Sequence, residues 1–348
     1  MTRKSFDPKY LDSLHLPMGT TWLLGECMEA KGQQQLWEKK RPESLRALKD
    51  QALIQSAESS NRIEGVEVST DRLKPLVLGR TKPRSRPEEE IRGYRRALEV
   101  IHSKYQNIEM NSKIIAQLHN LAQEGAGDAG LWKTKNNEII EFDPFGQRSV
   151  RFVPTNAKDT NSAMENLCES YQNEMTNSKR PALIVSSLFI LDFLCIHPFR
   201  DGNGRVSRLL SLLSLYQAGF NVGKYVSLER IVEENKQSYY EALKISSQGW
   251  HHQKHNSLPW INFYLSILRQ AYKEMTDHIE NSSHLISGKG EVVEAAVFKQ
   301  LGSFSLREIQ QQCPHVSAQM IKKVLNDLKK DKKVILVGRG RGALWKVK

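Results

Sequence analysis

The chain of 348 residues lacks any uninterrupted apolar run of about 18 residues, the length that a helix needs to cross a membrane. Its first residues, Met1 to Asp7, are polar and charged, so the sequence does not open on the apolar core of a secretion signal. We therefore expect no membrane contact and a cytoplasmic protein.

Cysteine is scarce, and none of the four residues has the spacing of a metal-binding or disulfide pair. They are Cys27, Cys168, Cys195 and Cys313. We expect reduced, buried thiols. A histidine-rich stretch at 248–255 has no acidic or cysteine partner nearby, so we predict a polar loop there rather than a zinc site.

Acidic residues are outnumbered: 51 Lys and Arg face 39 Asp and Glu, a net charge of +12. This balance suits anionic partners, among them ATP, nucleic acid and acidic protein surfaces. Charge alone does not choose among them.

Residues 197–208 connect two apolar helical runs, 183–196 and 206–216. They read His-Pro-Phe-Arg-Asp-Gly-Asn-Gly-Arg-Val-Ser-Arg. Proline disfavours α geometry at the residue before it, so Pro198 predicts that the first helix ends at His197. A tight loop should then open the second helix.

The loop carries residues that suit phosphates. Gly202 and Gly204 let backbone N–H groups turn toward one point beside the helix N-terminus, which predicts an anion site. Asp201 is a hard oxygen ligand of the kind that Mg²⁺ prefers. Asn203 has an amide that can donate to a phosphate oxygen.

Three further side chains complete this pattern. Arg205 and Arg208 are three residues apart, hence neighbours on one helix face, and both can fork onto phosphates. His197 is the nearby group that takes a proton near neutral pH. The stretch therefore predicts nucleotide phosphate chemistry; the alternative is a plain connecting loop with a solvated arginine pair.

The stretch resembles the signature of the Fic family, His-x-Phe-x-Asp/Glu-Gly-Asn-Gly-Arg-x-x-Arg, and matches it at every defined position. The resemblance covers about residues 40–275. It implies a mainly α protein, with a Fic-type helical bundle and a β-hairpin flap. It also implies a protein adenylyltransferase that moves AMP from ATP to a Ser, Thr or Tyr hydroxyl of a target protein, with the chain itself as one candidate target.

The resemblance also implies roles for individual residues. His197 would take the proton from the target hydroxyl, and Asp201 would hold Mg²⁺. The implied ATP-binding residues lie in the signature or on a later helix: Gly202, Asn203, Gly204, Arg205, Arg208, Tyr239 and Tyr240. Adjacent tyrosines on a helix are more often core residues than a platform for a base, so both interpretations stay open. Which of the two tyrosines would contact adenine also stays open.

An apolar stripe predicts a helix over 41–64, which ends in Ser60-Asn61-Arg62-Ile63-Glu64-Gly65. In isolation this is a polar helix end with a glycine cap. It resembles the inhibitory Ser/Thr-x-x-x-Glu-Gly/Asn motif of Fic proteins. That resemblance implies that Ser60 and Glu64 are inhibitory, with Glu64 paired to Arg208 in the place of the ATP γ-phosphate.

Strand-like segments at 139–142 and 150–153 flank a turn, Asp143-Pro144-Phe145-Gly146, which predicts a hairpin. Alone it reads as a surface excursion. The family resemblance implies a flap that lays a target segment beside the site by edge-strand pairing.

Three domains are expected: an N-terminal helical region at 1–110 with the inhibitory helix at about 41–65, a Fic core at 111–280 with the flap at about 131–154, and a winged helix at 288–348. Residues 1–40 suggest a loosely structured arm that packs on the core, and 286–290 a linker. Further helices are expected at 87–105, 111–123, 157–175, 228–245 and 260–275. His119 and Asp192 lie on apolar helices and are expected to be packed rather than functional.

The C-terminal part predicts three helices, at 292–301, 306–312 and 320–328, followed by strands at 333–337 and 343–347. From residue 288 on, 13 Lys and Arg face 5 Asp and Glu, a net charge of +8. A basic winged helix suits DNA phosphates. Its third helix lacks a clear set of base-reading residues, so DNA binding and a protein contact, such as one within a homodimer, both stay open.

Two other functions fit the same residues. One is a Fic-like transfer or removal of a different phosphate-linked group, because the signature constrains the phosphates and not the base. The other is a DNA-binding regulator whose Fic domain senses a nucleotide.

Overall fold

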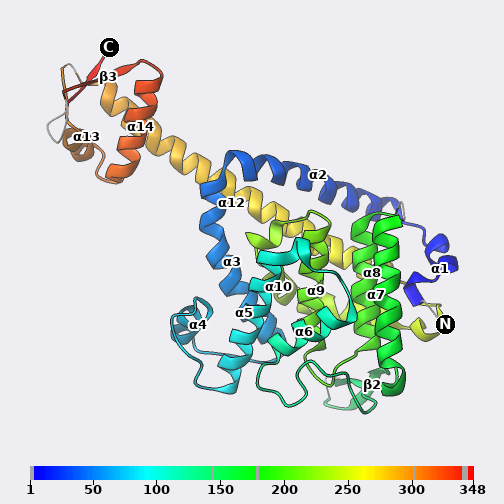
Figure 1. Ribbon diagram of the computed structural model, residues 1–348. Helices are drawn as coiled ribbons and strands as arrows, with labels where there is room; N and C mark the ends of the chain where they lie inside the picture. The colour runs from blue at the N-terminus through cyan, green and yellow to red at the C-terminus, as the bar shows by residue number, and fades with distance from the viewer. Residues whose placement is uncertain (1–3, 143–144, 178–179, 301, 339–343) are drawn as a thin grey trace. The chain divides into compact units, whose positions relative to one another are not determined.

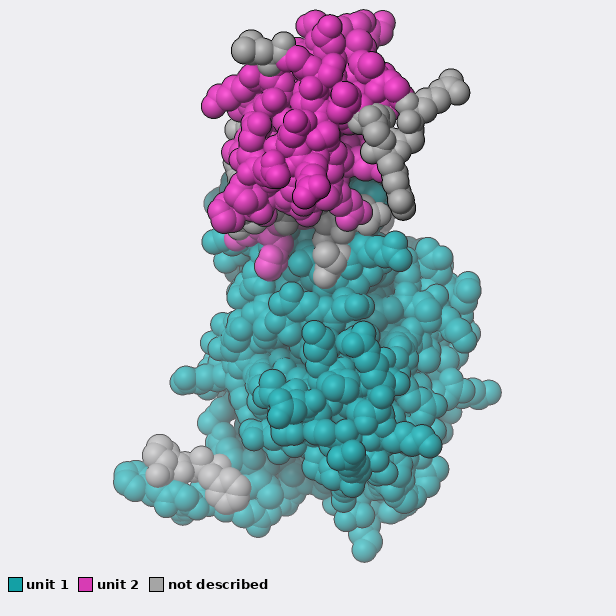
Figure 2. Space-filling view, turned by 90° about the vertical axis from the view of Figure 1, so that its left-hand side faces the viewer, with its two compact units in different colours: residues 1–275 teal, residues 276–348 magenta. Residues whose placement is uncertain are grey.

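A computed structural model describes residues 4–142, 145–177, 180–300, 302–338 and 344–348. These residues are mainly helical, as predicted, and they contain two separate antiparallel hairpins. The chain divides into two compact units, residues 1–275 and 276–348, which Figure 2 shows in different colours.

The helices of the first unit occupy most of its length. They are α1 (Pro8–Ser13), α2 (Met18–Lys40), α3 (Pro42–Ile63), α4 (Thr70–Val77), α5 (Arg86–Lys104), α6 (Ser112–Ala122), α7 (Thr160–Asn177), α8 (Ala182–Ile196), α9 (Asn203–Gln217), α10 (Leu228–Glu234), α11 (Lys236–Ser247) and the start of α12 (Leu258–Phe298). The strands β1 (Ile139–Phe142) and β2 (Arg148–Phe152) form its hairpin.

Helix α8 is the centre of the first unit. Every residue from Leu183 to Ile196 is buried, as the apolar run predicts. The helix contacts both α7 and α9, and Figure 1 shows α7 and α8 side by side. Burial on all sides fixes the end of α8, and with it the start of the loop that follows.

The N-terminal arm is more ordered than predicted. Helix α2 runs along the first part of α12, where Thr20 donates to Asn262 (2.7 Å) and Tyr272 donates to Gln34 (2.7 Å). The prediction was wrong because α2 buries only Thr20, Cys27 and Gln34, so its sequence carries almost no apolar period.

Other boundaries agree or differ for local reasons. Helices α3, α5, α6 and α7 lie within a few residues of their predicted ranges, and Asn111 caps α6 by accepting from Ile114 N (3.0 Å). The helix expected at 228–245 is two helices that meet at Asn235. Helix α4 was not predicted. The linker expected at 286–290 lies inside α12, because glycine in a helix costs only about 1 kcal/mol.

The second unit has its own core. Beyond α12 it contains α13 (Leu306–Gln312), α14 (Ala318–Lys330) and the hairpin of β3 (Val334–Val337) with β4 (Leu344–Val347). Ser305 and Glu308 form the predicted capping box at the start of α13. This order of elements is the one that we expected of a winged helix.

The four cysteines are buried and unbridged, as expected. Burial raises the pKa of the Cys27 and Cys168 thiols to about 12, so both stay protonated. No helix in the described ranges is long and apolar enough to cross a membrane.

Two helical glycines should respond oppositely to alanine. A Cβ on Gly93 in α5 would collide with the carbonyl oxygen of Leu121 in α6, whereas a Cβ on Gly25 in α2 would meet nothing within 4 Å. Gly93→Ala should lower the free energy of unfolding by about 1 to 3 kcal/mol through overpacking. Gly25→Ala should raise it by up to about 1 kcal/mol. Denaturant titration measures both, and equal effects would contradict the close packing of α5 on α6.

Candidate functional site

The candidate site begins where α8 ends. His197 caps the helix, and its N–H donates to Phe193 O (2.9 Å). Its backbone is left-handed, with φ 51° and ψ 61°. A residue other than glycine in this region costs roughly 1 to 3 kcal/mol, so surrounding contacts must hold it there.

Lys133 supplies part of that support from below the loop. Its buried ammonium donates to Ile196 O (3.1 Å) and to Asn137 Oδ1 (2.9 Å), and its own backbone N–H donates to Pro198 O (2.8 Å). Two carbonyls that flank His197 are therefore held by one residue. Burial lowers the pKa of Lys133 to about 8, so it remains charged at neutral pH.

His119 supports the next part of the loop. Gly130 N donates to its Nδ1 (2.8 Å), so the ring proton lies on Nε2, which donates to Asp201 O (3.0 Å). The ring stacks on Phe199 with centroids 3.6 Å apart. The prediction of a packed histidine is confirmed, and Phe199 is fully buried.

Asn203 closes the loop on itself. Its Oδ1 accepts from Phe199 N, and its Nδ2 donates to Phe199 O, each at 2.9 Å. We expected this amide to face a phosphate. In this structure it is engaged by the loop backbone instead, so its contact with a nucleotide stays a prediction.

These contacts draw the loop carbonyls toward the protein and leave the start of α9 for an anion. Gly202, the residue before α9, has φ 77° and provides no side-chain cap. The first N–H groups of a helix lack intrahelical partners and attract negative charge. The predicted anion site is therefore consistent with the backbone geometry.

The imidazole of His197 is arranged as a base. Its Nδ1 lies 3.3 Å from Leu194 O, and a carbonyl only accepts, so the proton is on Nδ1 and the lone pair is on Nε2. Burial, followed by the positive charge of Lys133, lowers the pKa of His197 to about 4. The ring is thus neutral at pH 7 and can accept a proton.

Arg208 is bound by the end of α3, as the family resemblance implied. Its Nε donates to Ser60 Oγ (2.8 Å), and its Nη2 donates to Ser60 O (2.8 Å) and Glu64 Oε1 (2.7 Å). Burial by itself would lower the pKa of Arg208, but the Glu64 carboxylate raises it above its ordinary value.

The Glu64 carboxylate lies between Gly204 and Arg208. It fills the space that a side chain on Gly204 would need, next to the Arg208 guanidinium. The buried Nη1 of Arg208 has no hydrogen-bond partner. An unsatisfied buried donor is costly, so an additional acceptor at this atom would stabilise the site.

The end of α3 is itself held in place by α10 and α11. Lys236 Nζ donates to Ile63 O (2.9 Å), and Arg62 Nη2 donates to Glu233 Oε2 (2.8 Å). Glu64 follows as the C-terminal cap residue of α3, and Gly65 follows with φ 81°.

Arg205 does not join Arg208. It is 2% exposed and donates to Glu90 Oε2 (2.6 Å) on α5 and to Asn61 Oδ1 (3.3 Å) on α3. We expected a phosphate ligand. In this structure Arg205 forms a buried ion pair with Glu90 that ties α9 to α5, so its contact with a phosphate stays a prediction.

A cavity of about 150 Å³ brings the site residues together. His197, Gly204 and Glu64 line it, and so do both Tyr239 and Tyr240. Tyr239 is buried against Trp260 and Phe263, whereas Tyr240 is partly exposed. The wall opposite comes from the hairpin, where Arg151 lies over the Tyr240 ring at 5.7 Å.

The hairpin has the predicted position and pairing. Ile140 faces Val150 in the register, which shifts between Ile139 and Ile140. Lys244 on α11 forms an ion pair with Glu141 (2.9 Å), and His251 binds Val153 O (2.7 Å). Of the expected turn, Asp143 and Pro144 lie outside the described residues.

Asp201 fits Mg²⁺ only as a single ligand. Its carboxylate side chain is 72% exposed, with Oδ1 accepting from Gly202 N (2.7 Å). Among the described residues no group of three His, Cys, Asp or Glu side chains could hold a metal ion. Magnesium often binds through one carboxylate plus substrate phosphates, and one exposed carboxylate beside an anion site suits that mode.

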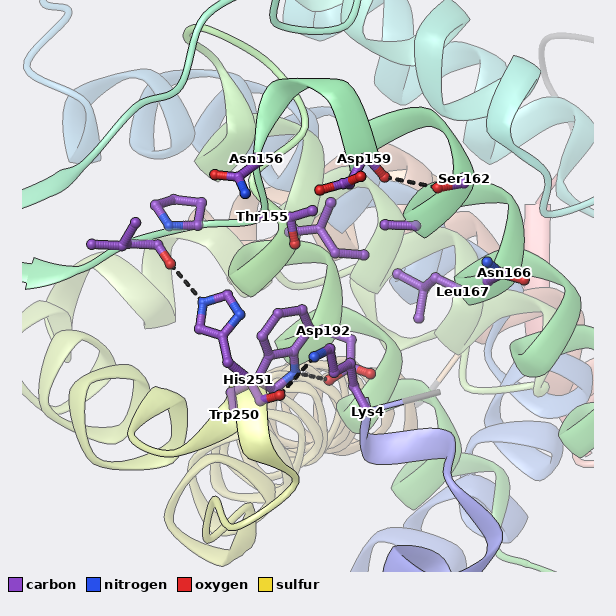
Figure 3. A pocket seen from close by; sticks show the side chains of 14 residues that line it. Lys4, Thr155, Asn156, Asp159, Ser162, Asn166, Leu167, Asp192, Trp250 and His251 are labelled. Carbon is purple, nitrogen blue, oxygen red and sulfur yellow. Dashed lines mark hydrogen bonds between the residues drawn. The ribbon is translucent and has the colours of Figure 1, made fainter. Parts of the chain in front are cut away.

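A larger cavity of about 610 Å³ lies beyond the hairpin (Figure 3). Asp192 borders it and accepts from Trp250 Nε1 (2.6 Å) and Ser5 N (3.1 Å). Burial raises the pKa of Asp192 to about 7. As expected, Asp192 is a packed residue, and it holds the N-terminal segment on α8.

Lys133, Glu90 and Arg151 belong to the site and were not predicted. Lys133 is buried and Lys135 exposed, yet both stand in the same polar segment of the sequence. Only the approach of 133–137 to the loop distinguishes them. Glu90 lies among three consecutive glutamates on α5, and no sequence signal sets it apart.

Residues 109–215 match the sequence model of the Fic/DOC family. A protein adenylyltransferase Fic of Drosophila grimshawi is 27% identical over 213 residues, which are 59% of this chain and 40% of that protein. A Fido domain-containing protein of Dictyostelium discoideum is 24% identical over 141 residues, or 40% of this chain and 90% of that protein. The match thus spans about two fifths of the length of the Drosophila relative.

Solved structures of Fic proteins share the fold. A Fic family protein of Desulfovibrio desulfuricans aligns with 96% of this chain and 97% of its own, with a TM-score of 0.62 and 18% identity. Fic-1 (aa134–508) of C. elegans aligns with 76% of this chain and 73% of its own, with a TM-score of 0.60 and 18% identity.

The pKa of His197 provides a test of the site geometry. At pH 5.5 an ordinary histidine is mostly protonated, whereas His197, with its pKa lowered to about 4, should be mostly neutral. Two-dimensional NMR of the imidazole nitrogens measures this, with His197→Gln for assignment. Lys133→Met should raise the pKa and exposed Lys135→Met should not. A midpoint near 6.5 in the unaltered protein would contradict the buried, Lys133-facing imidazole.

Proposed function

Because residues 109–215 form a Fic domain, we propose that the chain is a protein adenylyltransferase that transfers AMP from ATP to a hydroxyl side chain of a target protein. One observation carries the proposal. A neutral imidazole with a free Nε2 shares a small cavity with an anion site, in which the Glu64 carboxylate is bound by Arg208 against Gly204. Nucleotidyl transfer needs a group that accepts the proton of the attacking hydroxyl and a site that binds the phosphates of the nucleotide.

His197 Nε2 accepts the proton of the target Ser, Thr or Tyr hydroxyl as its oxygen bonds to the α-phosphorus. The bond from that phosphorus to the bridging oxygen of the β-phosphate breaks, and pyrophosphate leaves. The N–H groups at the start of α9 stabilise the phosphate oxygens, as helix N-termini do. Arg208 binds the terminal phosphate through a guanidinium fork once Glu64 has left.

Mg²⁺ would be held by Asp201 together with the nucleotide and would neutralise phosphate charge. The Asp201 carboxylate is 72% exposed and lies 3.8 Å from Arg205 Nη2, while the Asp201 backbone carbonyl accepts from His119. The cavity wall of Tyr239 and Tyr240 suits the adenine ring, and Tyr240 is the more accessible of the two.

We further propose that Glu64 inhibits this reaction. The cavity of about 150 Å³ is smaller than the roughly 300 Å³ of the smallest common ligand pockets, and Glu64 forms part of its wall. A carboxylate and a phosphate compete for the same guanidinium, so ATP binds productively only when the end of α3 moves. Ser60 holds Arg208 in the orientation that Glu64 requires.

The target segment is proposed to pair with an edge of the β1–β2 hairpin, which borders the cavity through Ile139 and Phe152. Such pairing positions a backbone without reading its sequence, so one flap accepts a hydroxyl from several residue types. The chain's own hydroxyl groups are candidates as well.

Removal of the base should abolish transfer. His197→Ala should lose incorporation of label from α-labelled ATP by a factor of at least about 100, within the range that general bases contribute. Intact mass measures a gain of one AMP, and His252→Ala, which alters an exposed histidine, is the control. Retained labelling in His197→Ala would contradict the assignment. A gain from UTP or another donor in place of ATP would favour a different Fic-like transfer.

Removal of the inhibitory carboxylate should increase ATP binding and labelling. A hydrogen bond to a charged group contributes roughly 1.5 to 3 kcal/mol, so Glu64→Gly should tighten ATP binding by about tenfold to a hundredfold. Calorimetry measures the affinity. Glu67→Gly, three residues farther along, removes the same charge from an exposed position and should change neither quantity. An unchanged affinity in Glu64→Gly would argue against inhibition.

A further inference from the structure

We propose that the second unit binds double-stranded DNA through the exposed face of α14. This inference does not depend on the transferase activity. It rests on the way in which α14 divides its side chains between core and solvent.

Helix α14 is anchored by one apolar face. Ile321, Leu325 and Leu328 follow the helical period and are almost fully buried in the core of the unit. Ser317 Oγ accepts from Met320 N (3.3 Å) and so caps the first turn. The helix is therefore rigidly placed, and its opposite face is presented to solvent.

The charged residues on the exposed face of α14 are almost all positive. Its exposed polar residues, from one end to the other, are Gln319, Lys322, Lys323, Asn326, Asp327, Lys329 and Lys330. Asp327 is the only acidic residue of α14, and it pairs with Lys330 (3.6 Å). Lys322, Lys323 and Lys329 thus keep their charge for a partner.

The less buried arginines of α5 differ, because they have acidic partners. Arg95 pairs with Glu99 on the same helix (2.5 Å), and Arg96 pairs with Glu124 (2.6 Å). Mixed signs along a face favour solubility and internal pairing. A face with four lysines and one aspartate favours an anionic surface instead.

The geometry suits a duplex rather than a compact anion. Helix α13 contacts α14, and the five residues between them bury Cys313 and Val316 in the core, so the two helices form a fixed helix-turn-helix. Helix α14 is roughly 20 Å long at about 1.5 Å per residue. Such a second helix fits the major groove, where residues of its first turns, here Gln319, Lys322 and Lys323, reach base edges and phosphates.

The test is fluorescence anisotropy of the full chain with a labelled 30-base-pair duplex of mixed sequence. We expect a dissociation constant of about 1 to 100 μM near physiological salt, and affinity that falls steeply as salt rises. The combined variant Lys322→Glu, Lys323→Glu and Lys329→Glu should weaken binding at least tenfold. It should also reduce the slope of log affinity against log salt by about one for each lysine.

A matched variant separates the site from the overall charge. Lys39→Glu, Lys113→Glu and Lys158→Glu reverse three exposed lysines of the first unit and leave α14 unchanged. DNA binding should then stay within about threefold. Circular dichroism and denaturation of both variants verify that they fold, and a misfolded α14 variant is replaced by Lys322→Gln with Lys323→Gln.

Three results would overturn the proposal. In the first, the unaltered chain would fail to bind the duplex at low salt. In the second, both triple variants would weaken binding equally, which would indicate non-specific attraction of a basic protein to a polyanion. In the third, the α14 variant binds DNA normally and changes the oligomeric state, which assigns this face to a protein contact.

Discussion

The site depends on how the backbone of one loop is oriented. Between Ile196 and Asp201, protein donors from outside the loop bind carbonyl oxygens on its inner side. These hydrogen bonds hold His197 in its left-handed conformation. The N–H groups at the start of α9 then face a position where an anion is favoured. The buried ends of α8 and α9 fix the two sides of this loop, and the fold around them serves to keep it in place.

Arg205 and Arg208 are both arginines of the same sequence motif on α9, but they have different partners in the structure. Both lie on the buried side of α9, yet Arg205 meets Glu90 and Asn61, whereas Arg208 meets Ser60 and Glu64. A buried charge needs a partner. For Arg205 that partner is a permanent part of the core. For Arg208 the partners lie at the end of α3, and one Arg208 nitrogen is without a hydrogen-bond partner.

Sequence reasoning succeeded where a pattern is local. The apolar period predicted α8 and α9, and proline and the glycines predicted the loop. The pair of Glu64 with Arg208 was implied by the resemblance of the hexamer ending at Gly65 to a Fic motif, and the structure contains that pair. It failed where long-range packing decides. Helix α2 is bound to α12 by isolated polar contacts, such as that of Thr20 with Asn262, which leave no period in the sequence. Lys133 is buried and Lys135 exposed only because the loop after α8 packs over Lys133. We expected the Asn203 amide to face a phosphate, but in the structure it binds the backbone of Phe199, four residues earlier in the chain.

Glu64 is the C-cap residue of α3, so its contact with Arg208 depends on the last turn of one helix. Helix ends open and close locally at a small fraction of the free energy of global unfolding. Above Glu64 the last turn of α3 is fastened to α10 and α11, and below it the chain turns at a glycine. A movement of Glu64 would therefore require only the contacts of this one helical turn to break, and the φ of 81° at Gly65 marks where the chain direction changes after it.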